Sequence, residues 1–295
     1  MAYKSGFVTI IGRPNVGKST LLNQLIGEKV AITSQKPQTT RNTIKGIVST
    51  DDYQIIFIDT PGVHKARNKL GEYMVNLAFE TINEVDAVLF MVDVTSVSDK
   101  DTNIVEKLKG LKTPIYLVLN KIDLVEKGKV LPIIDRFRAM MDFKTIIPIS
   151  AVKGEGVDII LKELIPILPE GPKYFDDDVP TDQPERAIVA EFIREQLFRV
   201  MSDEIPYGVG VEIISFKERQ DKDIIEVQAN IYCEKESHKR IIIGKGGNML
   251  KKIGSNARHE IEALLGIKVY LELWVKVREN WRNSESMLKM FGYDQ

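Results

Sequence analysis

A glycine-rich loop near the start of the chain could bind a phosphate group. Residues 12–19, GRPNVGKS, fit the P-loop pattern G-x-x-x-x-G-K-S/T, whose glycines let backbone N–H groups approach phosphate oxygens at a helix N-terminus. Lys18 can reach the β- and γ-phosphates, and the Ser19 hydroxyl can ligate Mg²⁺. The alternative is a glycine-rich turn with an exposed lysine. The predicted phosphate-binding residues are Gly12, Arg13, Pro14, Asn15, Val16, Gly17, Lys18, Ser19 and Thr20.

The DTPG motif, residues 59–62, could complete the phosphate side of this site. Asp59 can hold Mg²⁺ through a water molecule, and the Gly62 N–H can contact the γ-phosphate. The pattern D-x-x-G is weak alone, because Asp and Gly are common in turns. Its position at the end of an apolar run favours the phosphate interpretation.

The NKID motif, residues 120–123, predicts which base is bound. The Asp123 carboxylate can accept hydrogen bonds from N1–H and N2–H₂ of guanine, whereas adenine offers neither, so an ATP site is disfavoured. Asn120 would tie the loops around the base together, and the stem of Lys121 would lie along the base plane. Ser150 and Ala151 belong to a loop that would supply a backbone N–H for guanine O6. Each motif alone could be a polar loop, but all four in this order predict a guanine-nucleotide site.

Short apolar runs alternate with amphipathic stretches from residue 7 to about residue 168. Strands that are apolar throughout and separated by helical segments predict a doubly wound α/β domain with a mostly parallel sheet. Ligands of such sheets bind at the carboxyl ends of the strands, where each motif falls, so we expect the motifs to converge. The predicted strands are 7–11, 53–59, 87–93, 114–120 and 145–150.

A proline-rich, acidic stretch at residues 169–185 predicts a linker between two domains. Beyond it, helical and strand patterns follow in the order α-β-β-α-α-β, which predicts a smaller α+β domain. The predicted boundaries are 1–170 for the first domain, 171–185 for the linker and 186–295 for the second domain.

A second glycine cluster, Gly244-Lys245-Gly246-Gly247, lies between two predicted helices of this smaller domain. Within this order of elements, its G-x-x-G loop resembles that of a type II KH domain, which clamps the backbone of about four unpaired nucleotides. Basic residues outnumber acidic ones in the surrounding span, although Ile242 and Ile243 could equally line a groove or pack in the core. The resemblance implies RNA contacts by Ile243, Gly244, Lys245, Gly246, Gly247, Lys251 and Lys252.

The four nucleotide motifs together resemble the G boxes of translation-factor-class GTPases. The segment QTTR, residues 38–41, is similar to the switch I box of the subgroup that includes the Era and tRNA-modification GTPases. This resemblance implies that Thr40 completes the Mg²⁺ shell and that Asn15 coordinates a K⁺ ion beside the phosphates. Val63 stands where Ras-type GTPases place a water-orienting glutamine, and an aliphatic side chain cannot hydrogen-bond water. Lys18, Thr40, Gly62 and Asn15 are therefore the residues expected to take part in hydrolysis.

One G domain followed by one KH domain resembles the Era family, bacterial GTPases of small-subunit ribosome assembly. The resemblance implies Mg²⁺-dependent hydrolysis of GTP to GDP and binding of 16S rRNA near its 3′ end within the 30S subunit. The competing hypothesis is a membrane-associated regulatory GTPase whose C-terminal domain binds protein or lipid.

The composition limits the remaining classes of protein. The 295 residues carry a net charge of −1, which excludes a uniformly basic chain, and a single cysteine, which excludes an internal disulfide. No apolar run approaches the roughly 20 residues of a spanning helix, so any membrane contact is expected to be peripheral. We expect a cytoplasmic monomer. The three histidines show no metal-ligand spacing, so structural or surface roles are expected for His64, His238 and His259.

Overall fold

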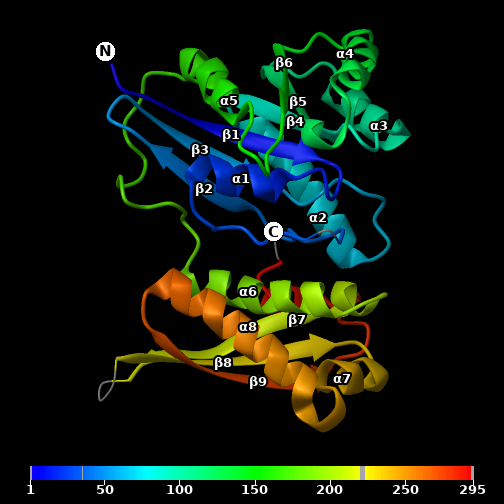
Figure 1. The fold of residues 1–295 in the computed structure, drawn as a ribbon, viewed down its shortest axis with the longest axis vertical. Helices are drawn as coiled ribbons and strands as arrows, with labels where there is room; N and C mark the ends of the chain where they lie inside the picture. Colours follow the sequence, from blue (N-terminus) through cyan, green and yellow to red (C-terminus); the bar gives the residue numbers. More distant parts are fainter. Residues whose placement is uncertain (1, 35, 220–222, 294–295) are drawn as a thin grey trace. The chain divides into compact units, whose positions relative to one another are not determined.

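The structure is a computed structural model that describes residues 2–34, 36–219 and 223–293, and the chain divides into two units (Figure 1). The first unit contains Met1–Ala66 and Met74–Asp182, and the second contains Arg67–Tyr73 and Gln183–Gln295.

The first unit is built on a six-stranded sheet in the order β2-β3-β1-β4-β5-β6. Every neighbouring pair is parallel except β2 and β3, which run antiparallel. The predicted mostly parallel α/β fold is therefore confirmed. The strands are β1 (Lys4–Gly12), β2 (Ile44–Ser49), β3 (Tyr53–Asp59), β4 (Ala87–Asp93), β5 (Ile115–Asn120) and β6 (Thr145–Ile149).

Helices cover both faces of this sheet (Figure 1). One core cluster joins α1 and α5 to side chains such as Ile10 and Leu89, and the other joins α3 and α4 to side chains such as Ile11 and Phe90. Helices cover both faces, so a ligand can reach the sheet at the carboxyl ends of its strands, where the polar residues of the motifs lie. The helices of this unit are α1 (Lys18–Ile26), α3 (Asp99–Leu108), α4 (Val130–Arg138) and α5 (Val157–Leu164). Helix α2 (Lys69–Glu80) begins in the second unit and ends in the first.

The stretch predicted as a linker follows the edge strand β2 for part of its length. The Ile47 N–H donates to the Pro180 carbonyl at 2.9 Å, and the Thr181 hydroxyl donates to the Lys45 carbonyl at 2.6 Å. Lys45 also pairs with Asp182 at 2.8 Å. These bonds satisfy backbone groups that an edge strand would otherwise expose.

The second unit contains the predicted order of elements, with a three-stranded sheet in the order β7-β8-β9. Strands β7 and β8 are antiparallel, while β8 and β9 are parallel, which leaves β9 at an edge. Helices α6 and α8 pack against each other over the sheet (Figure 1). The elements are α6 (Glu185–Val200), β7 (Gly210–Glu218), β8 (Ile224–Cys233), α7 (Glu236–Ile243), α8 (Asn248–Leu265), β9 (Lys268–Val277) and α9 (Glu285–Met290).

Candidate functional site

The glycine-rich loop between β1 and α1 packs directly on the ends of two other strands. A Cβ on Gly12 would lie 2.4 Å from the carbonyl oxygen of Met91, and a Cβ on Gly17 would lie 2.3 Å from Nδ2 of Asn120. Gly17 has φ 105° and Asn15 has φ 65°, both in the left-handed region. The loop therefore needs glycine at two positions for space and at one of them also for backbone conformation.

The three side chains expected to hold Mg²⁺ converge at the start of α1. Ser19 Oγ donates to Asp59 Oδ2 at 2.6 Å, and Thr40 Oγ1 donates to the same oxygen at 3.1 Å. Burial raises the pKa of Asp59, and its Oδ1 has no hydrogen-bond partner among the described residues. A divalent cation would stabilise this buried carboxylate, and hydroxyl and carboxylate oxygens are ligands that Mg²⁺ accepts. The three residues therefore fit a Mg²⁺ ion.

Lys18 is a buried cation within the loop. Its Nζ donates to the carbonyls of Gly12 at 3.2 Å and Arg13 at 3.0 Å. Burial lowers the pKa of Lys18 to about 8, although the nearby Asp59 carboxylate acts in the opposite direction. A phosphate beside the loop would favour the charged form, which fits the predicted role of Lys18.

The side chain of Arg13 points away from the phosphate loop. Its Nε donates to Asp101 Oδ1 at 2.6 Å, and its guanidinium also donates to the Ser96 carbonyl at 2.6 Å. Asp101 is fully buried and helps to cap α3. Arg13 thus anchors the loop to α3, and only its backbone is available to a phosphate.

The segment after β3 rests on the glycine-rich loop. A Cβ on Gly62 would lie 2.6 Å from both Cα and N of Pro14, and the Val63 N–H donates to the Gly12 carbonyl at 3.0 Å. This contact leaves no room for a larger residue at position 62.

Replacing Gly62 with Ala is expected to slow the GTP hydrolysis that the motifs predict about 100-fold, because the added methyl group would push the Gly62 N–H away from the predicted γ-phosphate position. GDP lacks that phosphate, so GDP affinity should stay within about twofold of the wild-type value. Single-turnover hydrolysis and GDP titration measure the two effects. Unchanged hydrolysis would contradict the predicted contact.

Asn120 joins the loops on the base side of the site. Its Nδ2 donates to the Val16 carbonyl at 2.7 Å, and its Oδ1 accepts from the Ala151 N–H at 2.9 Å. Ala151 therefore positions Asn120 in this structure instead of offering a free N–H to a base. Lys121, with φ 68°, extends across the same region and donates to the Asn15 carbonyl at 2.9 Å.

Two carboxylates near the base loops have different surroundings. Burial would raise the pKa of Asp93, but hydrogen bonds from Lys121 and Thr95 outweigh it and lower that pKa. Asp123 is half-buried, and within the described ranges no side chain pairs with its carboxylate. Asp123 therefore keeps both oxygens available as acceptors for a base edge.

In the second unit, the G-x-x-G loop turns the chain from α7 into α8. Gly244, Gly246 and Gly247 have φ values of 73°, 61° and 77°, all in the left-handed region. A Cβ on Gly244 would lie 2.6 Å from the Cβ of Met249, whereas Cβ atoms on Gly246 and Gly247 would meet open space. The first glycine is thus required for packing, while the last two leave an open backbone surface.

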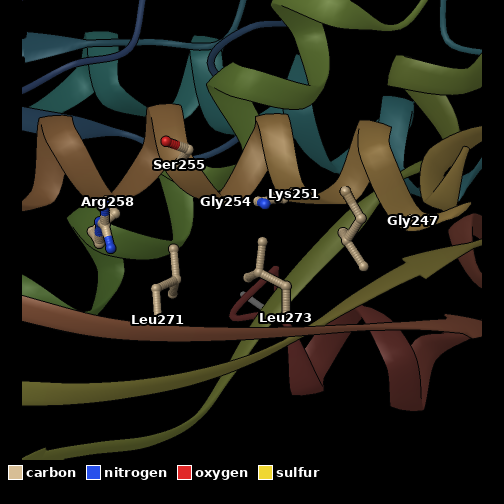
Figure 2. A pocket seen from close by; sticks show the side chains of 8 residues that line it. Gly247, Lys251, Gly254, Ser255, Arg258, Leu271 and Leu273 are labelled. Carbon is tan, nitrogen blue, oxygen red and sulfur yellow. The ribbon is translucent and has the colours of Figure 1, made fainter.

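A groove of 440 Å³ continues from this loop between α8 and the edge strand β9 (Figure 2). Leu271 and Leu273 point from β9 toward α8, which carries Lys251 and Arg258 along the groove (Figure 2). An apolar floor with a basic rim suits unpaired bases and their phosphates. The lining residues are Gly247, Leu250, Lys251, Gly254, Ser255, Arg258, Leu271 and Leu273.

The other residues considered for RNA binding differ in their exposure. Ile242 is fully buried and therefore packs in the core, whereas Ile243 is half-buried. Lys245 and Lys252 are exposed, but neither lines the groove. Sequence reasoning missed Leu271 and Leu273 and counted Arg258 only among the basic residues of this domain, because the groove depends on where β9 lies against α8.

Comparisons with known proteins match both units. The sequence model of a family described as 50S ribosome-binding GTPase matches residues 7–121, and a KH domain model matches residues 204–282. GTPase Era of Ruminiclostridium cellulolyticum is 61% identical over 99% of this chain and 98% of its own length. GTPase Era of Alkaliphilus metalliredigens is 55% identical over the full length of both chains. The chain belongs to the Era family of GTPases. The family predicted from the motifs is thereby confirmed.

Solved Era structures share the fold of this chain. A crystal structure of Era in complex with MgGDPNP and nucleotides 1506–1542 of 16S ribosomal RNA has a TM-score of 0.96 and 40% identity, covering 99% of this chain and 100% of its own. A variant of Aquifex aeolicus Era bound to GDP·AlF₄⁻ has a TM-score of 0.95 and 41% identity, with the same coverage. In the described part of this Era-family chain, every helix is too short or too polar to cross a membrane.

Proposed function

We propose that this chain couples GTP hydrolysis to the binding of 16S rRNA near its 3′ end during assembly of the 30S subunit. The observation that carries the proposal is the basic, apolar-floored groove beside the G-x-x-G loop, in a chain 40% identical to an Era that was solved with that rRNA segment. The family model whose description mentions the 50S subunit matches residues 7–121 only, so it does not include the KH domain.

In the proposed nucleotide site, Ser19, Thr40 and Asp59 hold Mg²⁺, either directly or through water. The ion, when bound, neutralises charge that develops on the phosphate oxygens. Lys18 binds the β- and γ-phosphates, and Gly62 donates its N–H to the γ-phosphate. These contacts favour the triphosphate over the diphosphate.

In the proposed base site, Asp123 accepts from the Watson–Crick edge of guanine, and Asn120 holds the surrounding loops in place. Its two hydrogen bonds to Val16 and Ala151 join the P-loop to the loop after β6. A site of this kind selects guanine because another base leaves the Asp123 carboxylate without its hydrogen-bond donors.

In the proposed RNA site, bases lie on Leu271 and Leu273 while phosphates approach Gly246, Gly247 and the amines of Lys245 and Lys251. The open space at the two glycines lets a phosphate approach the backbone closely. Lys252, which faces solvent, adds to the attraction of the phosphate backbone.

Crosslinking to whole ribosomal RNA tests the RNA assignment. The purified chain, loaded with GDPNP, is irradiated with total ribosomal RNA, and the adducts are located by reverse transcription. The proposal predicts that adducts concentrate near the 3′ end of 16S rRNA. Adducts spread evenly over both large rRNAs would contradict it.

We also propose that a K⁺ ion, held by Asn15, assists hydrolysis in place of an arginine finger. Asn15 lies in the loop with φ 65°, and Val63 cannot orient water. Turnover in KCl is expected to exceed turnover in NaCl at least about tenfold, and Asn15→Ala should remove the difference. Equal turnover of the wild-type chain in the two salts would contradict the proposal.

Peripheral contact with the cytoplasmic face of the membrane is a second candidate. Lys245, Lys251 and Lys252 are exposed, and their positive charge attracts anionic lipid headgroups as well as RNA. Sedimentation with vesicles of phosphatidylglycerol tests it, and binding to neutral phosphatidylcholine vesicles is the control. No difference between the two vesicles would exclude this candidate.

A further inference from the structure

His64 occupies a bridging position that its sequence context does not reveal. Its Nδ1 lies 2.7 Å from the carbonyl oxygen of Gly62, and its Nε2 lies 3.3 Å from Nε2 of Gln38. The side chain is half-buried between these partners. Sequence reasoning expected only a structural or surface role, because the contact joins residues 26 positions apart.

The two partners determine the tautomer of the imidazole ring. A carbonyl oxygen can only accept, so Nδ1 must carry the proton and donate to Gly62. Nε2 then has a lone pair and accepts an N–H from the Gln38 amide. Both ring nitrogens of neutral His64 are therefore satisfied by this pair of contacts.

The same contacts fix the peptide that joins Gly62 to Val63. His64 Nδ1 donates to the Gly62 carbonyl of this peptide, and the Val63 N–H of the same peptide donates to the Gly12 carbonyl at 3.0 Å. Gly62 also packs so closely on Pro14 that the peptide cannot shift toward the glycine-rich loop. With this peptide fixed, the direction of the neighbouring Gly62 N–H is restricted as well.

Gln38 connects this peptide to the segment that carries Thr40. Gln38 adopts φ 63°, a left-handed conformation that is uncommon for a residue with a side chain. Two residues later, Thr40 donates to Asp59 at 3.1 Å. The His64–Gln38 bond therefore links the loop of the proposed γ-phosphate contact to the loop of a proposed Mg²⁺ ligand.

We propose that His64, with Gln38 as its partner, is a positioning residue for GTP hydrolysis. It holds the Gly62 N–H in line for the γ-phosphate and ties the two loops together, so that the site is ordered although Val63 cannot orient water. The inference rests on the proposed phosphate contact of Gly62.

Replacing His64 with Ala is expected to lower kcat for GTP about tenfold, since one or two positioning hydrogen bonds are lost. KM for GTP and Kd for GDP should change less than about twofold, because the contacts that bind the β-phosphate and the base remain. His259→Ala, which removes an exposed histidine on α8, is the matched control and should leave all three constants unchanged.

Two conservative replacements separate the two bonds. In His64→Asn the amide nitrogen takes the place of Nδ1 and keeps the bond to Gly62. In His64→Gln the amide oxygen takes the place of Nε2 and keeps the bond to Gln38. Each is expected to recover part of kcat, and Gln38→Ala should cost little further activity in the His64→Ala background because the two residues share one contact.

Unchanged kcat in His64→Ala would overturn the proposal. A parallel loss of kcat, GDP affinity and thermal midpoint in His64→Ala, without recovery in His64→Asn or His64→Gln, would also overturn it and indicate a purely structural role. Gly62→Ala separates this proposal from the one it rests on. If Gly62→Ala slows hydrolysis and His64→Ala does not, only the role of His64 fails; if neither does, the Gly62 contact fails as well.

Discussion

Asn in place of Asp123 is expected to lower the affinity for GTP about 10³- to 10⁴-fold, because the amide presents an N–H to the N1–H and N2–H₂ donors of guanine. Xanthine carries a carbonyl at C2 where guanine has an amine, so the variant should gain affinity for XTP. Asp123 has no partner among the described side chains, so its replacement leaves no protein group unpaired. Calorimetric titration with GTP, XTP and ATP measures the change.

Asp135→Asn is the matched control for this prediction. Asp135 is exposed on α4, and its replacement removes the same charge outside the proposed site. GTP affinity of this control should match that of the wild-type chain. If Asp123→Asn bound GTP as tightly as the control, the proposed reading of guanine by Asp123 would be wrong.

Asp in place of both Gly246 and Gly247 is expected to weaken RNA binding about 100-fold or more, because two carboxylates would stand where phosphates approach the backbone. The added side chains meet open space, so they act on the ligand and do not disturb the packing of α7 and α8. Fluorescence anisotropy with an RNA of nucleotides 1506–1542 of 16S rRNA measures the loss.

Gly266→Asp is a control with similar backbone strain. Gly266 has φ 67°, and a Cβ there also meets open space, but it ends α8 and does not line the groove. Its RNA affinity should fall less than about twofold. Equal losses of RNA affinity in the control and the double variant would show that backbone strain, and not repulsion of the RNA, causes the effect.

Vesicle binding of the double variant should fall far less than RNA binding if the G-x-x-G loop binds an RNA backbone.

Most of the fold could be predicted from the sequence, because the apolar runs, glycines and prolines that indicate its elements are patterns of neighbouring residues. Strand β8 is the second strand of the predicted α-β-β-α-α-β order, and α7 ends at Ile243, directly before the first glycine of the second glycine cluster. Strand β2 was missed because only part of its short sequence, IKGIVS, is apolar and its last two residues are half-exposed. It forms at the sheet edge through pairing with β3, which no local pattern reveals.

The candidate site was predictable where a motif carries the chemistry and not where distant loops meet. Ser19, Thr40 and Asp59 were found from their motifs, and the structure brings all three within hydrogen-bond distance. The anchoring of Arg13 by Asp101 spans 88 positions, so it was not visible in the sequence. The floor of the RNA groove was missed for the same reason, since β9 follows the G-x-x-G loop by more than twenty residues.

The most direct test of the proposed coupling is the affinity for nucleotides 1506–1542 of 16S rRNA with Mg²⁺ and either GDPNP or GDP bound. We predict at least about fivefold tighter binding with GDPNP, and by thermodynamic linkage the RNA should tighten GDPNP binding, relative to GDP, by the same factor. Identical RNA affinity in the two nucleotide states would contradict the proposed coupling.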